Sequence, residues 1–250
     1  MHPTPADGRE GQCHVVGTGA IRRLMLPLFM EIPGLSHAFT ARGSDPVRAI
    51  AAAAGRSLPV FALRQVHGRA VHAIEERDSP PPPGQSPKAD ALITRRRGVG
   101  LQVSVADCVP ALICDPVRGW LGAVHAGWRG TVAGALKATI HALIGRGARS
   151  ADLLVPLGPS IGRCCFEVGE EVVAAFRDSD PAGGTSIVDG RPARVDLIAA
   201  NHRQAVQEGV PEDRIATSGL CTACRPDLLE SHRRSNGAPG RTAAFIDWSD

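Results

Sequence analysis

The chain has 250 residues, of which 43% are hydrophobic and 21% charged, as is typical of a globular protein with a sizeable core. Its formal net charge of +3 is too small to indicate a nucleic-acid partner, and we interpret the basic run at 95–97 as a solvated loop. No stretch approaches the roughly 18 consecutive apolar residues of a membrane span, and the first residues lack the pattern of a signal peptide. The sequence therefore predicts a cytoplasmic protein with no nucleic-acid or membrane partner.

A helix is predicted at 45–56, after a strand that leads into a loop at 35–45. Asp45 is the expected N-cap, Pro46 occupies the first helical position and Gly55 ends the helix. This is the clearest helix of the first part of the chain.

Strands dominate the rest of the chain. Apolar runs predict strands at 60–68, 70–76, 89–94, 99–108, 110–116, 120–128 and 240–248, and a strand followed by a Gly/Pro loop at 151–162. Helices are predicted at 131–147, 167–178 and 194–210. Because consecutive strands are mixed with single helices, the order favours an α+β or mixed α/β fold over a regular doubly wound sheet. We expect a loosely structured segment over residues 1–20 and one domain over residues 21–250.

Three residues with metal-binding side chains end apolar runs, namely His67, Cys108 and His125. Each is followed closely by a glycine or proline turn. Two imidazoles and one thiolate suit zinc, and three protein ligands leave a position open for water or substrate, as in catalytic sites. The gaps of 41 and 17 residues match no compact zinc motif, so the spacing alone does not decide whether they bind a metal.

The same residues support a second interpretation. Cys108 is then a nucleophile and His125 its base, with Asp107 or a backbone carbonyl orienting the imidazole ring. Cys108 cannot bind a metal and attack a substrate in the same state. The residues by themselves leave both readings open.

The seven cysteines are an odd number, in a chain predicted to occupy a compartment where disulfides are rare. We interpret four of them, Cys164, Cys165, Cys221 and Cys224, as structural thiols. A four-thiolate zinc site usually needs two Cys-x-x-Cys pairs, and this chain has one, CTAC at 221–224. Adjacent cysteines such as Cys164 and Cys165 rarely bind one metal together.

Seven segments, in this order, resemble a known family: LRQVHG, ADALIT, ADCVPALICD, AVHAGWRG, LGPSIGRCCFEVG, CTAC and SHRRSNGAPGRTAAFI. Together they resemble the bacterial members of the laccase-domain family, which are known as multicopper polyphenol oxidases and as purine nucleoside phosphorylases. The resemblance runs from about residue 35 to residue 246. ADC followed by HAGWRG is its most specific part.

The resemblance implies a single α/β domain similar to the cytotoxic-necrotising-factor type of cysteine deamidase. It implies that zinc, with copper as the alternative ion, is held by His67, Cys108 and His125. It also implies phosphorolysis of adenosine, inosine and methylthioadenosine, together with adenosine deamination. Purine nucleosides and phosphate are therefore the expected small-molecule partners.

Within this resemblance we assign roles to four further residues. Arg42, Arg64 and Arg129 lie near predicted strand ends, and a planar guanidinium pairs well with phosphate, so we expect them to bind phosphate or ribose. Asp107 is expected to perform acid–base work or to orient a neighbouring group. The glycine-rich turn at 158–162 matches no phosphate-binding fingerprint.

Some positions depart from the family pattern. Phe166 and His232 stand where members often carry tyrosine, and the whole chain has none. The segment FTARGS at 39–44, which contains Arg42, is shorter than the FTTR-x-GG stretch common in relatives. These departures leave the substrate preference and the role of Arg42 open.

Three alternative functions are weighed against the nucleoside enzyme. One is a metal-free Cys108–His125 amidohydrolase that edits a peptidoglycan precursor. A copper-dependent polyphenol oxidase is less favoured, because the chain lacks the multiple histidine clusters of a blue-copper and trinuclear centre. A non-enzymatic binding module leaves the three ligand-type residues unexplained.

Overall fold

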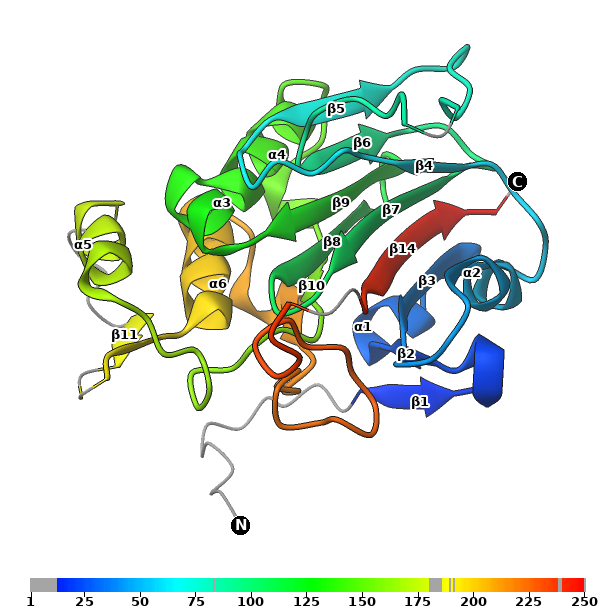
Figure 1. Cartoon of the computed structure of the whole chain (residues 1–250). Helices are drawn as coiled ribbons and strands as arrows, with labels where there is room; N and C mark the ends of the chain where they lie inside the picture. Colours follow the sequence, from blue (N-terminus) through cyan, green and yellow to red (C-terminus); the bar gives the residue numbers. More distant parts are fainter. Residues whose placement is uncertain are drawn as a thin grey trace.

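Two six-stranded β-sheets make up the centre of the protein, as the computed structural model in Figure 1 shows. The structure describes residues 13–82, 84–179, 186–188, 190, 192–237 and 240–249. The first sheet has the order β1 (His14–Val16), β2 (Arg23–Met25), β3 (Leu35–Thr40), β14 (Thr242–Trp248), β7 (Gly100–Val105) and β4 (Val60–Ala62). The second has the order β13 (Ile215–Thr217), β10 (Val155–Leu157), β8 (Val109–Asp115), β9 (Trp120–Ala126), β6 (Ala91–Thr94) and β5 (Val71–Ile74).

Both sheets are mixed. The pairs β4–β7, β5–β6 and β10–β13 are parallel, whereas the long pairs β8–β9, β3–β14 and β7–β14 are antiparallel. A separate antiparallel pair joins β11 (Ile187–Val188) to β12 (Arg194–Val195). The mixed α/β architecture predicted from the order of the elements is therefore confirmed.

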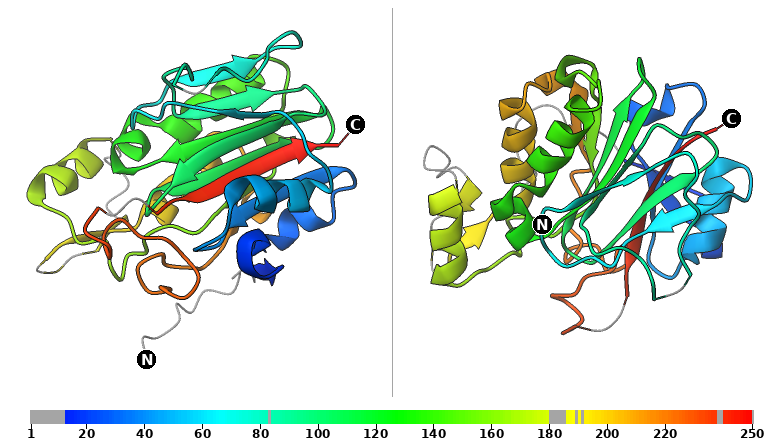
Figure 2. Two further views of the ribbon diagram at one scale, coloured as in Figure 1. Left: turned by 45° about the vertical axis from the view of Figure 1, so that its right-hand side comes forward. Right: turned by 90° about the horizontal axis from the view of Figure 1, so that it is seen from above.

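The helices cover the outer faces of the two sheets (Figure 2, right). Helix α2 (Pro46–Ala54) packs on the first sheet, where Ile50 meets Ala243 and Phe245 of β14. The second sheet is covered by α3 (Trp128–Ala133), α4 (Ala135–Ile144) and α6 (Leu197–Gln207). The described residues also include α1 (Pro27–Met30), α5 (Glu170–Ser179) and the short 3-10 turns Gly19–Ile21, Ser150–Asp152 and Glu212–Arg214.

Strand β8 shows why the central strands read as continuous apolar runs. Val109, Ala111 and Ile113 point to the core shared with the helices, whereas Leu112 and Cys114 point to the core between the two sheets. Successive side chains of a strand face opposite ways, so a strand buried on both faces needs apolar residues at every position.

The helix predicted at 45–56 is confirmed as α2. The Asp45 side chain accepts a hydrogen bond from the backbone N–H of Arg48, and Gly55 adopts the left-handed conformation that ends the helix. The single helix predicted at 131–147 is wrong. The chain forms α3 and α4 instead, and Gly134, with φ of 78°, separates them because an L residue with a side chain rarely adopts that conformation.

Two further boundaries differ from the prediction. Strand β4 ends at Ala62, so His67 lies in the loop that follows and not at the end of a strand. Strand β1 lies inside residues 1–20, the segment predicted to be loosely structured, whose residues 1–12 lie outside the described residues. Within the described ranges, no helix is both long and apolar enough to cross a bilayer.

Candidate active site

His67, Cys108 and His125, here called the histidine–cysteine group, come together at one end of the sheets. Their ligand atoms all lie within 4.8 Å of one another. The two imidazole rings are nearly perpendicular, at 82°, with centroids 4.8 Å apart. His125 is supplied by β9 and is buried, Cys108 by the turn between β7 and β8, and His67, the most exposed, by the loop after β4. Two nitrogens and one sulfur at this separation form a donor set that suits a transition metal and leaves one position open.

Asp90, just before β6, organises this group. Its fully buried carboxylate lies 2.9 Å from Nδ1 of His125, and it accepts backbone hydrogen bonds from His67 (2.9 Å) and Gly68 (2.7 Å). The contact with Nδ1 leaves Nε2 of His125 as the atom that can face a metal. One carboxylate therefore fixes both the ring of one ligand and the backbone of another.

Gly127 leaves the space that the histidine–cysteine group occupies. A Cβ atom at this position would lie 2.9 Å from Sγ of Cys108 and 3.1 Å from Cδ2 of His67. Its φ of −70° is open to any residue, so close approach, and not backbone conformation, requires glycine here. This explains the first glycine of the HAGWRG segment.

Hydrogen bonds among Cys108, His67, His125 and Asp90 set the charges of the metal-free site. Burial alone disfavours the thiolate, but hydrogen bonds with His125 and His67 outweigh it and lower the pKa of Cys108 to about 7. Burial also opposes protonation of His125, yet hydrogen bonds with Asp90 and Cys108 raise the pKa of His125 to about 9. A divalent cation bound here would displace the proton from His125.

Asp107 is held in a left-handed conformation, with φ of 82°, immediately before Cys108. Its Oδ1 accepts a hydrogen bond from the hydroxyl of Thr222 (2.5 Å), and its Oδ2 accepts one from the backbone N–H of Arg233 (2.7 Å). Its own carbonyl accepts from the N–H of Ile161 (2.9 Å). Both carboxylate oxygens therefore bind the loop between β13 and β14, and the strained backbone sets the direction of Cys108.

A cavity of about 500 Å³ opens above the histidine–cysteine group. It is within the size range of small-molecule sites in proteins. Its walls are partly aromatic and partly basic, and they include Gln65, Ser104, Ala106, Asp107, Trp128, Arg129, Ile161, Phe166, Leu197, His232, Arg233 and Arg241. Phe166 and His232, the two departures from the family's tyrosines, both lie in these walls.

The arginines of the cavity differ in part from those expected. Arg129 lines it, together with Arg233 and Arg241, which the sequence did not single out. Within the described part of the chain, none of these three forms an ion pair with a carboxylate. Arg42 lies outside the lining, with Nε 3.7 Å from Glu230, and the exposed Arg64 lies outside it as well.

Sequence reasoning also missed Asp90 and took Asp107 or a carbonyl as the group that orients His125. The available signal was an acidic residue directly before the mostly apolar run ALIT. A charged side chain at the start of a buried strand needs hydrogen-bond partners. For Asp90 these partners are the backbone N–H of His67 and the imidazole ring of His125.

Residues 44–249 match the family model described as multi-copper polyphenol oxidoreductase laccase. The chain belongs to this laccase family. Purine nucleoside phosphorylase SCO2081 of Streptomyces coelicolor is 38% identical over 217 residues, which cover 84% of this chain and 86% of that relative. Adenosine deaminase RL5, from an unknown prokaryotic organism, is 38% identical over 191 residues, covering 73% of this chain and 72% of the relative.

Solved structures share the fold of this laccase-family chain. The crystal structure of YlmD from Geobacillus stearothermophilus matches with a TM-score of 0.83 and 28% identity, covering 94% of this chain and 99% of that one. The hypothetical protein YfiH of Bacillus licheniformis matches with a TM-score of 0.82 and 27% identity, covering 92% and 97%. The single mixed α/β domain is therefore an architecture of the family.

Proposed function

We propose that this protein is a zinc-dependent purine nucleoside enzyme. It cleaves adenosine, inosine and methylthioadenosine with phosphate, and it deaminates adenosine. The observation that carries the proposal is the placement of the histidine–cysteine group in a cavity of about 500 Å³ that also holds three arginines without acidic partners among the described residues. Relatives named purine nucleoside phosphorylase and adenosine deaminase support it.

The donor set fits zinc. His67, Cys108 and His125 would hold the ion, with Asp90 fixing the ring of His125. Zinc bound there would supply Lewis-acid chemistry, by activating water or polarising an oxygen of the substrate. Copper is the alternative ion, since the family description names copper and imidazole binds both metals.

The cavity walls suit the two halves of a phosphorolysis reaction. A phosphate oxygen forms a bond to the anomeric carbon of ribose while the bond from that carbon to the base breaks. The base leaves with the electron pair and takes up a proton. Arg129, Arg233 and Arg241 can hold the phosphate, and Trp128 and Phe166 offer apolar surface to the purine. We assign Asp107 an orienting role, because both its carboxylate oxygens already accept hydrogen bonds.

The reaction is tested by incubating inosine with zinc-loaded protein, with and without phosphate, and separating the products by chromatography. Release of hypoxanthine and ribose 1-phosphate only with phosphate is the expected result. Adenosine with phosphate should likewise give adenine. Without phosphate, adenosine should be deaminated to inosine. If zinc is bound and neither base nor inosine appears, the proposal fails.

The phosphate-binding arginines are tested by the Michaelis constant for phosphate. Arg129→Ala and Arg241→Ala should raise it by roughly ten- to a hundredfold, since a hydrogen bond to a charged group contributes about 1.5–3 kcal/mol. Arg48→Ala, on the outer helix α2, is the matched control. Arg42→Ala and Arg64→Ala test the two sequence predictions in the same assay. If the Michaelis constant for phosphate were unchanged in all four of these arginine variants, the proposed anion-binding role would be wrong.

A metal-free amidohydrolase is the second candidate, and one observation favours it. Cys108, His125 and Asp90 form a hydrogen-bonded series in which the pKa of the thiol is lowered to about 7, as nucleophilic cysteines require. On this alternative, chelation leaves activity on an amide of a peptidoglycan precursor intact, and alkylation of Cys108 abolishes it. Likeness to the cytotoxic-necrotising-factor type of deamidase would suit this candidate and stays a prediction.

A copper polyphenol oxidase has less support. Among the described residues, the groups that could hold a metal contain at most two histidines. A trinuclear copper centre needs many more.

A further inference from the structure

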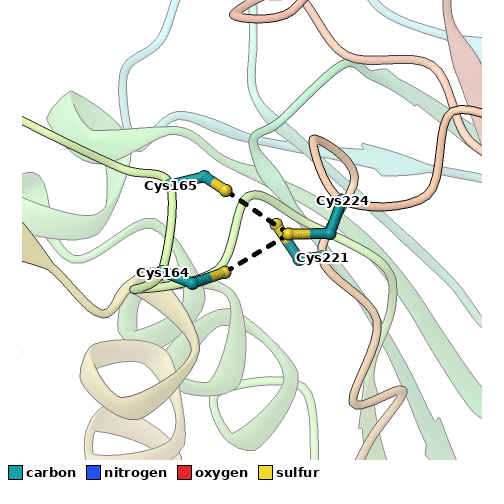
Figure 3. A group of neighbouring side chains, drawn as sticks. All are labelled: Cys164, Cys165, Cys221 and Cys224. Atoms are coloured by element: carbon teal, nitrogen blue, oxygen red, sulfur yellow. Dashed lines mark hydrogen bonds between the residues drawn. The ribbon is translucent and has the colours of Figure 1, made fainter. Parts of the chain in front are cut away.

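The four cysteines interpreted as separate structural thiols lie together in the structure (Figure 3). Cys164 and Cys165 belong to the turn after β10, and Cys221 and Cys224 to the loop between β13 and β14. Their sulfur atoms all lie within 4.8 Å of one another, and the side chains point toward a common centre. We propose that this four-cysteine group is a second metal site, a closed structural site for one Zn²⁺.

The sulfur separations agree with a tetrahedral site. Sγ of Cys224 lies 3.6 Å from that of Cys164 and 3.4 Å from that of Cys165. Zinc–sulfur bonds of about 2.3 Å in a tetrahedron place sulfurs roughly 3.8 Å apart, so only a small outward movement is needed. A disulfide requires about 2.05 Å, and all seven cysteines of the chain are free in this structure. Four sulfur ligands fill the coordination sphere, as in structural rather than catalytic zinc sites.

The surrounding backbone is arranged for thiolates. The N–H of Gly162 donates to Sγ of Cys221 at 3.2 Å. A Cβ atom on Gly162 would lie 3.2 Å from Sγ of Cys164 and from Cβ of Cys221, so glycine makes room for the sulfurs. The guanidinium of Arg234 donates to the carbonyls of Thr222 (2.6 Å) and Ala223 (3.3 Å), inside the CTAC turn. Its positive charge offsets the negative charge that four thiolates around a divalent cation retain.

The four-cysteine group joins the two loops that form one wall of the cavity. The N–H of Thr222 donates to the carbonyl of Ser160, which sets the register of the two loops. Thr222 also contacts Asp107, and the Arg233 guanidinium donates to the carbonyls of Cys165 (3.2 Å) and Glu167 (2.9 Å). A cation shared by both loops would therefore hold Phe166 and Arg233 in place without touching the substrate. The proposal does not depend on which reaction the cavity performs.

Zinc analysis of the full chain tests the proposal. The protein is purified in reducing buffer, loaded with zinc and dialysed against metal-free buffer. Wild type should hold two zinc ions per chain, His67→Ala one, the double variant Cys221→Ser/Cys224→Ser one, and the control Cys13→Ser two. Cys13 lies outside both groups. The proposal would be overturned if wild type held at most one zinc and His67→Ala lost it. It would also be overturned if the double variant held as much zinc as wild type.

Cobalt and alkylation give readouts that do not depend on the fold of the double variant. Cobalt-loaded His67→Ala should show strong thiolate-to-metal charge-transfer absorption and the visible bands of a tetrahedral ion. In wild type, zinc should protect Cys164, Cys165, Cys221 and Cys224 from iodoacetamide, as read by peptide mass spectrometry. Equal labelling of these cysteines with and without zinc, or disulfides between them in the metal-loaded chain, would contradict the site. If wild type held one zinc and His67→Ala kept it, the result would support the four-cysteine site. It would also show that the proposed function does not use zinc.

Discussion

The histidine–cysteine group and the four-cysteine group differ in how the protein holds them. Around the first, a buried carboxylate fixes one imidazole ring and the backbone of another ligand, and β9 supplies one ligand directly. The second lies on two loops, with Cys164 and Cys224 exposed to solvent. The direct backbone contacts to the sulfur of Cys221 are hydrogen bonds from the N–H groups of Gly162 and Cys224.

This difference separates two uses of a metal. A group that the protein already holds in position can leave one coordination position free for a substrate. A group on loops uses all its ligands on the ion, and the ion then provides the rigidity that the loops lack. We therefore expect loss of the first metal to abolish activity, and loss of the second to loosen one wall of the cavity.

The largest expected effect is that of Cys108→Ser. Serine is a poor zinc ligand, and a catalytic metal contributes several kcal/mol to transition-state stabilisation, so kcat/KM should fall by about a thousandfold or more. One zinc per chain should remain, in the four-cysteine group. Steady-state kinetics with zinc analysis measures both. A Cys108→Ser variant within tenfold of wild-type activity would remove the catalytic role from the histidine–cysteine group.

Asp90→Asn should have the next largest effect. Loss of a carboxylate that orients a ligating histidine typically lowers metal affinity by about 10–100-fold. Competition with a chelator should show this decrease at the histidine–cysteine group alone. Asp115→Asn is the matched control, since Asp115 is equally buried and accepts N–H bonds from Val117 and Arg118. If both variants weaken zinc equally, the role of Asp90 is general stability.

Two glycines allow the groups to be disturbed one at a time. Gly127→Ala places a methyl group 2.9 Å from Sγ of Cys108, and Gly162→Ala places one 3.2 Å from Sγ of Cys164. Overpacking costs about 1–3 kcal/mol, so each variant should weaken zinc at its own group by roughly tenfold. Zinc titration of the two variants measures this. Loss of both ions in either variant would show that the groups are not independent.

The central strands were predictable because strands buried on both faces carry unbroken apolar runs, as β8 does. His67, Cys108 and His125 were candidates because they end or follow such runs, but the choice between metal binding and a thiol nucleophile came from the family resemblance and not from the pattern. The break between α3 and α4 was not, since Gly134 is as compatible with a helix interior as with a left-handed junction until packing decides.

The four-cysteine group could not be derived from the sequence. Its two cysteine pairs lie about 60 residues apart on loops, which have no periodic pattern that would fix the directions of the side chains. The cavity arginines were missed for a similar reason. Arg233 and Arg241 belong to a loop whose course is set by hydrogen bonds to Asp107 and Cys165.

The smallest expected effect is on the pH dependence of stability. It comes from His37, which is buried like His125. His37 has no carboxylate partner among the described residues; its Nε2 accepts the N–H of Leu26, and burial lowers its pKa to about 4. Between pH 6.5 and pH 4 the unfolded chain then binds a proton that the folded chain does not, so stability falls as the pH falls. The loss for this one group is about 1 kcal/mol at pH 5.5 relative to pH 7. Urea unfolding of zinc-free wild type and His37→Gln measures it, because glutamine keeps an acceptor without a titrating ring. His125 is present in both proteins, so the effect of its raised pKa cancels when the two unfolding free energies are subtracted. Equal pH dependence of stability in wild type and His37→Gln would contradict the lowered pKa of His37.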